Sequence, residues 1–299
     1  MSGLPDGNAV SVAFGLPTIS STMLKKRVLT AVPLAAVALL LVWTLPTAWL
    51  GLLLAVISAW AAWEWAALSG LKRRNDQAIF AAAVGALLGV LWTLGAARPA
   101  GIEAWALPAG AWWLGMLAVL TVRSRQPDLA APSRNVRLGS GAVTLVLAWL
   151  GLVALHGQPD SGPFWLTLCF LLVWGADIGA FFAGRHFGRV PLAPALSPKK
   201  TWEGVAGGAL LAVGLLVLLV GLGRGMGLVL PSTPALMLLG VIVVAASVVG
   251  DLTESLLKRW AGAKDSGQVL PGHGGILDRV DALLAGAPVM AIGVMVLEG

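Results

Sequence analysis

Long apolar runs separated by short polar segments dominate the 299-residue chain. Most of them approach the roughly 20 residues that a helix needs to cross the hydrocarbon core of a bilayer. They lie at about residues 29–47, 49–69, 78–97, 103–122, 138–156, 163–184, 203–223, 229–250 and 282–297. The pattern predicts an all-α, polytopic integral membrane protein with about nine transmembrane helices, since lipid-exposed backbone must be hydrogen-bonded internally. The last window is the weakest, because it is 16 residues long and contains Pro288.

The basic residues indicate the orientation of these spans. If the N-terminus is cytoplasmic, the cytoplasmic segments contain 18 of the 20 Lys and Arg residues, and only Arg98 and Arg224 fall on the other side. Such an excess is what the positive-inside rule predicts for the correct orientation. We therefore expect an integral protein of the cell (inner) membrane with a cytoplasmic N-terminus, and any active site built from these basic segments would face the cytoplasm.

Composition supports the membrane assignment and narrows the chemistry. The chain is 58% apolar and 11% charged, and its formal net charge of +6 comes from the basic cytoplasmic segments, so we expect no nucleic acid partner. Fourteen Trp and no Tyr mean that any interfacial aromatic belt is built from Trp. The single cysteine, Cys169, excludes an intramolecular disulfide and a cysteine-rich metal site.

Polarity also divides the chain into regions. The first 22 residues lack the basic start of a cleavable signal peptide. We expect a disordered cytoplasmic segment at 1–28, a transmembrane scaffold of five helices at 29–157 and a catalytic transmembrane region of about four helices plus cytoplasmic loops at 158–299. A second interpretation is that translation begins at Met23. Within the scaffold, Glu64 is the one unusual side chain. We expect it to snorkel to the interface or to pair with an arginine, and a direct role in function is the alternative.

The eighth apolar window ends in a polar stripe. Asp251, Glu254, Ser255 and Lys258 stand at positions i, i+3, i+4 and i+7, which places them on one face of a continuing helix. We expect this stripe to lie at the cytoplasmic boundary of the membrane.

A second acidic pair follows a glycine-rich turn. Three glycines surround His273, and Asp278 and Asp281 then stand one helical turn apart at the start of the last apolar window. Carboxylates are favoured at a helix N-terminus, and glycine-rich backbone can approach a phosphate closely. Two aspartate clusters with interleaved Lys and Arg suit a Mg²⁺ ion that holds a polyphosphate, because Mg²⁺ prefers carboxylate, water and phosphate oxygens.

Further polar residues lie upstream of these clusters. Asp177 falls inside the sixth window, where an ionisable side chain is costly and is by default functional or paired. In "LSPKKTWEG", the lysines Lys199 and Lys200 could serve only as a topological anchor, but Thr201 and Glu203 suit the start of a helix. We favour a phosphate contact for this segment.

The segment "SLLKRWAGAKDSGQVLPGHGGILDRVD", residues 255–281, resembles the signature of the phosphatidate cytidylyltransferases, also called CDP-diacylglycerol synthases. That pattern runs Ser, any, hydrophobic, Lys, Arg, four residues, Lys, Asp, and then Pro, any, His, Gly, Gly, hydrophobic, any, Asp, Arg, hydrophobic, Asp. Every one of these positions is met. The resemblance extends upstream to "WGADIGAFFAGRHFGR" and "LSPKKTWEG", where Phe181 stands in place of the usual tyrosine, so a tyrosine hydroxyl cannot be essential here.

The resemblance implies the reaction CTP + phosphatidate → CDP-diacylglycerol + pyrophosphate, and so a nucleotidyltransferase of phospholipid biosynthesis. It implies CTP, phosphatidate and membrane lipid as partners, Mg²⁺ or Mn²⁺ with an assisting monovalent cation left open, and a homodimer by analogy. The catalytic candidates are Asp251, Asp278, Lys258, Arg279 and His273. The substrate-binding candidates are Asp177, Ser197, Lys199, Lys200, Glu203, Ser255, Arg259, Lys264, Asp265, Gly274 and Gly275. The metal candidates are Asp251, Asp278 and Asp281.

His273 is expected to donate a hydrogen bond to phosphate or to order its loop rather than to carry a proton. The second pKa of a phosphate monoester is about 6, so the attacking phosphate is already largely ionised at neutral pH. Three rival hypotheses stay open at this point. They are a CTP-dependent lipid kinase, an ion-coupled transporter that uses Asp177 and Asp251, and a relative that has lost catalysis.

Overall fold

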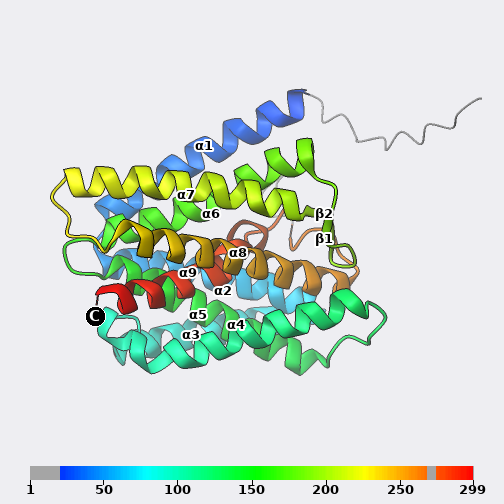
Figure 1. The fold of residues 1–299 in the computed structure, drawn as a ribbon. Coiled ribbons are helices and arrows are strands. Elements are labelled where there is room, and N and C mark those ends of the chain that lie inside the picture. Colours follow the sequence, from blue (N-terminus) through cyan, green and yellow to red (C-terminus); the bar gives the residue numbers. More distant parts are fainter. Residues whose placement is uncertain (1–20, 268–273, 299) are drawn as a thin grey trace, which may run out of the picture. The chain divides into compact units, whose positions relative to one another are not determined.

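The computed structural model describes residues 21–267 and 274–298, and most of this part of the chain is helical (Figure 1). The helices are α1 (Ser21–Thr44), α2 (Thr47–Leu68), α3 (Arg74–Thr93), α4 (Ile102–Arg125), α5 (Arg134–His156), α6 (Gly162–Phe187), α7 (Trp202–Gly225), α8 (Thr233–Ala261) and α9 (Leu277–Glu298). A 3-10 helix, η1 (Pro99–Gly101), precedes α4. The strands β1 (Pro191–Ala193) and β2 (Ser197–Thr201) lie between α6 and α7.

Eight helices of the described chain, α2 to α9, are long and apolar enough to cross a membrane. The prediction of an all-α, polytopic membrane protein is confirmed at that level. The doubted last window forms the 22-residue helix α9, with Pro288 inside it. The count of nine is not confirmed, because the apolar part of α1 within the described residues, Val32–Thr44, is shorter than a span.

The structure differs from the predicted regions near the N-terminal end of the described chain. Helix α1 begins at Ser21, so residues 21–28 are helical rather than disordered, and the helix formers Leu24, Lys25 and Lys26 favour that outcome. The expectation for residues 1–20 lies outside the described residues. The chain divides into one compact unit that ends at Ala38 and another that begins at Leu39, and the expected boundary between scaffold and catalytic region at residue 157 stays a prediction. Within the second unit one hydrophobic cluster includes residues from Val42 to Val294, so the expected scaffold and catalytic regions share a core.

Helices α6 and α7 pack with their backbones in near contact because small residues line both of them. A Cβ atom added at Gly179 would lie 2.6 Å from the carbonyl oxygen of Gly207, and one added at Gly208 would lie 2.5 Å from the carbonyl oxygen of Ala176. Small residues allow this approach in membrane helices, where van der Waals packing drives helix association. The pairing fixes the position of Asp177, which belongs to the same stretch of α6.

The strands β1 and β2 form an antiparallel hairpin that the sequence patterns do not predict. It is joined to the start of α7, where the Thr201 side chain accepts a hydrogen bond from the Gly204 backbone N–H at 3.1 Å. Glu203 accepts hydrogen bonds from the backbone N–H groups of Arg189 and Val190 at 3.1 and 3.2 Å. The expected helix start at Thr201 is therefore confirmed. The hairpin places the lysine pair on β2.

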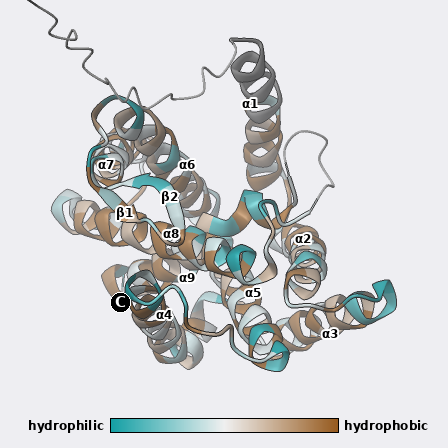
Figure 2. Ribbon diagram, turned by 90° about the vertical axis from the view of Figure 1, so that its right-hand side faces the viewer, coloured by the Kyte–Doolittle hydropathy of each residue, from teal (hydrophilic) through white to brown (hydrophobic). Residues whose placement is uncertain are grey.

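Hydrophobic residues cover most of the long helices, whereas the hydrophilic ones gather at β2, at helix ends and in loops (Figure 2). The polar ends of α8 and α9 lie next to each other, because these two helices pack closely. A Cβ atom added at Gly250 would lie 2.5 Å from the carbonyl oxygen of Asp281. This packing brings together the two acidic clusters that the sequence separates.

Candidate active site

The polar stripe of α8 faces the hairpin. The Lys200 ammonium on β2 forms an ion pair with the Asp251 carboxylate, and Ser255 on the next turn donates to the same carboxylate at 3.4 Å. Both charged side chains are about a quarter exposed, so a charged group from outside the protein can reach them. The hairpin and α8 therefore form one wall of the candidate site.

Carboxylates from three helices converge beside this wall. Asp281 on α9 interacts electrostatically with Asp177 on α6 and with Asp251 and Glu254 on α8. Asp177 also interacts with Lys200. Asp281 has no cationic partner within the described chain, where its carboxylate accepts a hydrogen bond from the Ala282 N–H. Like charges at short range repel each other, so this group of carboxylates favours an added cation.

Lys258 bridges two of the acidic side chains. Its ammonium lies 2.6 Å from a carboxylate oxygen of Glu254 and 2.8 Å from Oδ1 of Asp278. The Glu254 side chain is fully buried, and its second oxygen, Oε1, lacks a partner among the described residues. A single ammonium thus neutralises part of the charge of two carboxylates, which leaves the region net acidic.

The other oxygen of Asp278 holds the glycine-rich loop. Oδ2 lies 2.8 Å from the Gly275 N–H and 2.9 Å from both the N–H and the hydroxyl of Ser266. Gly274 adopts a φ of 81°, a conformation that favours glycine. A Cβ atom there would also lie 2.6 Å from Asp278 Oδ2. Asp278 therefore orders the loop as well as pairing with Lys258.

Glu64 is placed differently from the sequence-based expectation. Its side chain is buried and points toward the start of α9, so it does not snorkel, and it forms no ion pair with an arginine within the described part of the chain. Its carboxylate accepts hydrogen bonds from the backbone N–H groups of Ile276 at 3.0 Å and Leu277 at 2.8 Å, and the Ser266 hydroxyl lies 2.8 Å away. The first N–H groups of a helix have no partner inside the helix, and an acidic side chain there is favoured by the helix dipole.

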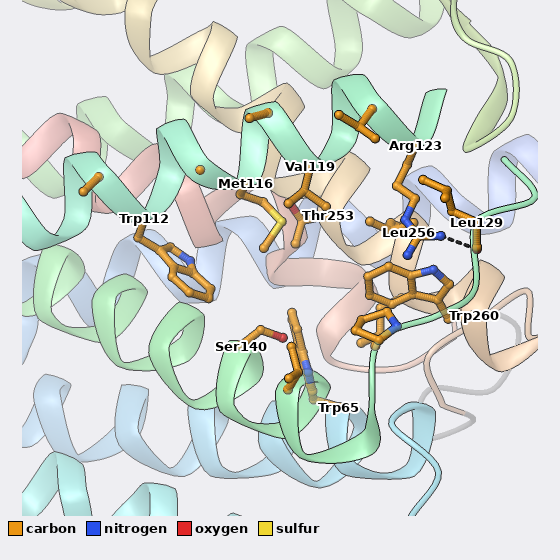
Figure 3. Close-up of a pocket in the computed structure, with 17 residues that line it drawn as sticks. Trp65, Trp112, Met116, Val119, Arg123, Leu129, Ser140, Thr253, Leu256 and Trp260 are labelled. Atoms are coloured by element: carbon orange, nitrogen blue, oxygen red, sulfur yellow. Dashed lines mark hydrogen bonds between the residues drawn. The ribbon is translucent and has the colours of Figure 1, made fainter. Parts of the chain in front are cut away.

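An apolar cavity of about 680 Å³ lies on the other side of α8 (Figure 3). Trp112, Met116 and Val119 of α4 line it together with Thr253 and Trp260 of α8. Its polar atoms are mostly engaged: the Arg123 guanidinium, for example, donates to the carbonyl oxygens of Leu129 and Ala130 and lies 5.2 Å from the Trp260 ring centroid. The cavity is therefore a place for hydrocarbon rather than for charged reactants.

Comparison of the sequence with known proteins assigns the chain to a family. The model of the cytidylyltransferase family matches residues 25–297. The chain belongs to the cytidylyltransferase family. It is 43% identical to the phosphatidate cytidylyltransferase of Pseudomonas aeruginosa, over 90% of this chain and 96% of that protein. It is 37% identical to that of Haemophilus influenzae, over 89% and 96%, and 38% identical to that of Brucella suis, over 89% and 92%.

The remaining predicted site residues differ in their contacts and in their exposure. Arg259 donates from Nε to the carbonyl oxygen of Leu196 at 3.1 Å, so it ties α8 to the hairpin. Glu203 holds the segment after α6 through the two backbone N–H groups described above. His273 lies outside the described residues. Ser197 is partly exposed, whereas Lys199, Lys264, Asp265 and Arg279 are exposed.

Three residues of the site network are absent from the sequence-based site set. The position of Glu254, four residues before Lys258 on the polar stripe, was a usable signal for an ion pair. Ser266 carried no such signal. Glu64 was visible as an unusual charge in an apolar window, but its partners are 202 to 213 residues away in the chain. Spacing along one helix cannot show such a contact.

The residues suit the metal ion that the family resemblance implies, although they do not enclose it. Among residues 21–267 and 274–298, no group of three or more His, Cys, Asp or Glu side chains is placed to hold a metal ion. Asp251 and Asp281 nevertheless lie on the packed helices α8 and α9 and interact electrostatically. Mg²⁺ usually binds one or two carboxylates and takes its other ligands from water and substrate phosphates. The donor set is therefore compatible with Mg²⁺.

Proposed function

We propose that the protein transfers the cytidylyl group of CTP to phosphatidate, which yields CDP-diacylglycerol and pyrophosphate. The convergence of Asp177, Asp251 and Asp281 beside Lys200 and Lys258, at the basic ends of apolar helices, carries this proposal. Such a site can receive a nucleotide from water and a lipid phosphate from the adjoining leaflet. The relatives described above are named for this activity, and the chain aligns with nearly their whole length.

The reaction joins two polyanions, so the protein has to reduce their repulsion. An oxygen of the lipid phosphate attacks the α-phosphorus of CTP, and the bond from that phosphorus to the bridging oxygen of the β-phosphate breaks. Lys199, Lys200, Lys264 and Arg279 are the basic groups proposed to contact the phosphates. Their charge would stabilise the negative charge that moves onto the leaving pyrophosphate.

Asp251, Asp278 and Asp281 would hold the Mg²⁺ ion. When bound, the ion would supply positive charge at the phosphate oxygens. Asp278 would also keep the Gly274–Gly275 backbone in place, because its Oδ2 already accepts three hydrogen bonds. Lys258 would hold Asp278 and Glu254 in position. Removal of the ion with a chelator should abolish product formation, and Mg²⁺ and Mn²⁺ added back separately, with and without K⁺, would identify the required cations.

His273 is proposed as a hydrogen-bond donor to phosphate. His273→Gln keeps a donor and should therefore lose much less activity than His273→Ala, with no change in the pH profile. A general acid or base would instead contribute roughly 10²- to 10⁴-fold, and glutamine could not replace it. Equal inactivity of the two variants, together with loss of a limb of the pH–rate curve, would make His273 a proton carrier.

The direct test is to incubate the purified protein with CTP, Mg²⁺ and phosphatidate and to identify the nucleotide and lipid products. Pyrophosphate and CDP-diacylglycerol together support the proposal. Release of CDP with a newly phosphorylated lipid would instead identify a CTP-dependent kinase. Asp251→Asn serves as the inactive control for contaminating activity.

We also propose that the site faces the cytoplasm in the inner membrane and that the protein is a homodimer. Cysteines introduced at Gln126 and Met226, which are exposed at the C-terminal ends of α4 and α7 and are expected on opposite sides of the membrane, should react oppositely with an impermeant maleimide in spheroplasts and in inverted vesicles. Cys169 is buried and gives little background. Light scattering of the protein in detergent would measure the oligomeric state, and a monomer would refute the dimer.

A further inference from the structure

Glu64 lies outside the signature segment, residues 255–281, but its side chain on α2 contacts that segment. The residue is only 3% exposed near the end of α2, and each of its two carboxylate oxygens accepts a backbone N–H from the start of α9. These N–H groups, of Ile276 and Leu277, directly precede Asp278. The carboxylate therefore determines where the first turn of α9 begins.

Ser266 extends this contact to Asp278. Its hydroxyl lies 2.8 Å from a Glu64 oxygen and 2.9 Å from Asp278 Oδ2. A hydroxyl carries a single proton, so the two carboxylates share one donor. The chain of contacts continues from Asp278 to Lys258 and Glu254 at 2.8 and 2.6 Å. One connected network thus links α2, the loop before α9, and both acidic helices of the site.

Two glycines show how closely the loop surrounds Glu64. A Cβ atom added at Gly267 would lie 2.6 Å from Glu64 Oε1, and one added at Gly275 would overlap the Glu64 carboxylate and the Ser266 hydroxyl. Neither glycine has a φ in the left-handed region. Both are therefore required by the space that Glu64 occupies, not by backbone conformation.

We propose that Glu64 is a positioning residue for the cytidylyl transfer, which sets the register of the loop and the first turn of α9 and so places the carboxylate of Asp278. The inference rests on the proposed function for its catalytic consequence. The role of Glu64 does not require contact with CTP or lipid. A small displacement of a reacting or binding group lowers turnover more than it lowers ground-state binding.

The first experiment compares Glu64→Gln with Ser69→Ala. Glutamine has nearly the same size, but it replaces one of the two accepting oxygens with a donor and removes the charge at the start of α9. Ser69 is also buried at the end of α2, and its hydroxyl lacks a partner within the described chain, so Ser69→Ala controls for disturbance of this region. We expect kcat of Glu64→Gln to fall about tenfold or more, with both KM values within about threefold.

Amide hydrogen exchange, measured without substrates, distinguishes a local effect on the loop from a general loss of stability. Glu64→Gln should speed exchange about tenfold or more in peptides that cover residues 274–280, because one of the two amides loses its acceptor and the other keeps only an uncharged one, and leave α4 and α7 unchanged. Equal acceleration in α4 and α7, or a kcat within about twofold of wild type, would overturn the proposal. If the wild type makes no CDP-diacylglycerol, the proposed function fails, while the exchange pattern still decides the positioning of the loop.

A second variant covers the case in which Glu64→Gln folds poorly. Gly267→Ala adds a methyl group whose three nearest atoms all belong to the Glu64 side chain. It should lower kcat about tenfold in the wild-type background and less than about twofold in a Glu64→Ala background, because the contact is then already absent. Independent, multiplicative losses in the double variant would show that Gly267 and Glu64 act separately and would contradict the proposal.

Discussion

The two faces of α8 near its C-terminal end differ in almost every respect. Asp251, Glu254, Ser255 and Lys258 form one face, and Thr253, Leu256, Leu257 and Trp260 form the other. The second set repeats the spacing of the first, shifted by two residues, which is about 200° around a helix. One face takes part in ion pairs with β2 and α9, and the other lines the apolar cavity beside α4.

The difference shows how a membrane enzyme can keep charge and hydrocarbon apart over the width of one helix. The polar face forms ion pairs with side chains from elements far apart in the sequence, whereas Leu257 on the apolar face packs in a cluster with Trp65 and Trp113. Substitutions on the two faces of α8 should therefore have different effects. Changes on the polar face should alter turnover, and changes on the apolar face should alter stability.

Asp278→Asn should have the largest effect, because it weakens both functions of a residue that faces the polar side of α8. Asparagine has a single side-chain oxygen, so it can accept from Ser266 and Gly275 or face Lys258, but not both, and Lys258 loses one of its two carboxylates. We expect turnover to fall about 10²- to 10³-fold and the free energy of unfolding to fall by about 1 to 3 kcal/mol. Product formation and thermal unfolding in detergent measure the two losses, and unchanged stability would show that the hydrogen bonds of Asp278 Oδ2 are weak.

Asp251→Asn should lower turnover about 10²-fold or more while thermal stability stays close to wild type, since the Lys200–Asp251 pair is partly solvated and such pairs contribute little to stability. Thr253→Val on the opposite face is the matched control, because the Thr253 hydroxyl donates to the Val249 carbonyl oxygen of its own helix. Retention of more than about a tenth of wild-type turnover in Asp251→Asn would exclude Asp251 from the metal site.

Leu257→Ala should reverse the pattern. Leu257 is buried in a cluster with Trp65 and Leu277, so the substitution enlarges the cavity region and should lower the free energy of unfolding by about 2 to 4 kcal/mol. We expect kcat of the folded fraction to change less than about threefold. A large loss of kcat without loss of stability would mean that the two faces of α8 are coupled.

Phe181→Tyr should have the smallest effect. Phe181 is 42% exposed on α6 and meets Phe182 edge to face, with ring centroids 5.4 Å apart. An added hydroxyl has free space, and the related family pattern has tyrosine at this position. A change in kcat/KM beyond about fivefold, which corresponds to about 1 kcal/mol, would instead indicate a tight apolar contact.

Local patterns in the sequence were sufficient for the apolar helices and for the spacing of the polar stripe. Hydropathy predicts α2 to α9, and the i, i+3, i+4 spacing predicts that Asp251, Glu254 and Lys258 share a face, because both are properties of a single helix. The same patterns could not show the hairpin that places Lys200 beside Asp251, since strand pairing depends on partners rather than on period. They also misplaced Glu64. A carboxylate in an apolar window has two low-energy solutions, a route to water or a buried set of donors, and only the tertiary structure distinguishes them.

The near contact of α6 and α7 inverts the usual meaning of an alanine scan. At most positions alanine removes atoms and is the mildest probe of a side chain. At Gly179 and Gly208 it adds a methyl group where the carbonyl oxygens of Gly207 and Ala176 lie within 2.6 and 2.5 Å of the new atom. The smallest available substitution would therefore separate the two helices. Because β2 continues directly into α7, that separation would move Lys200 away from Asp251.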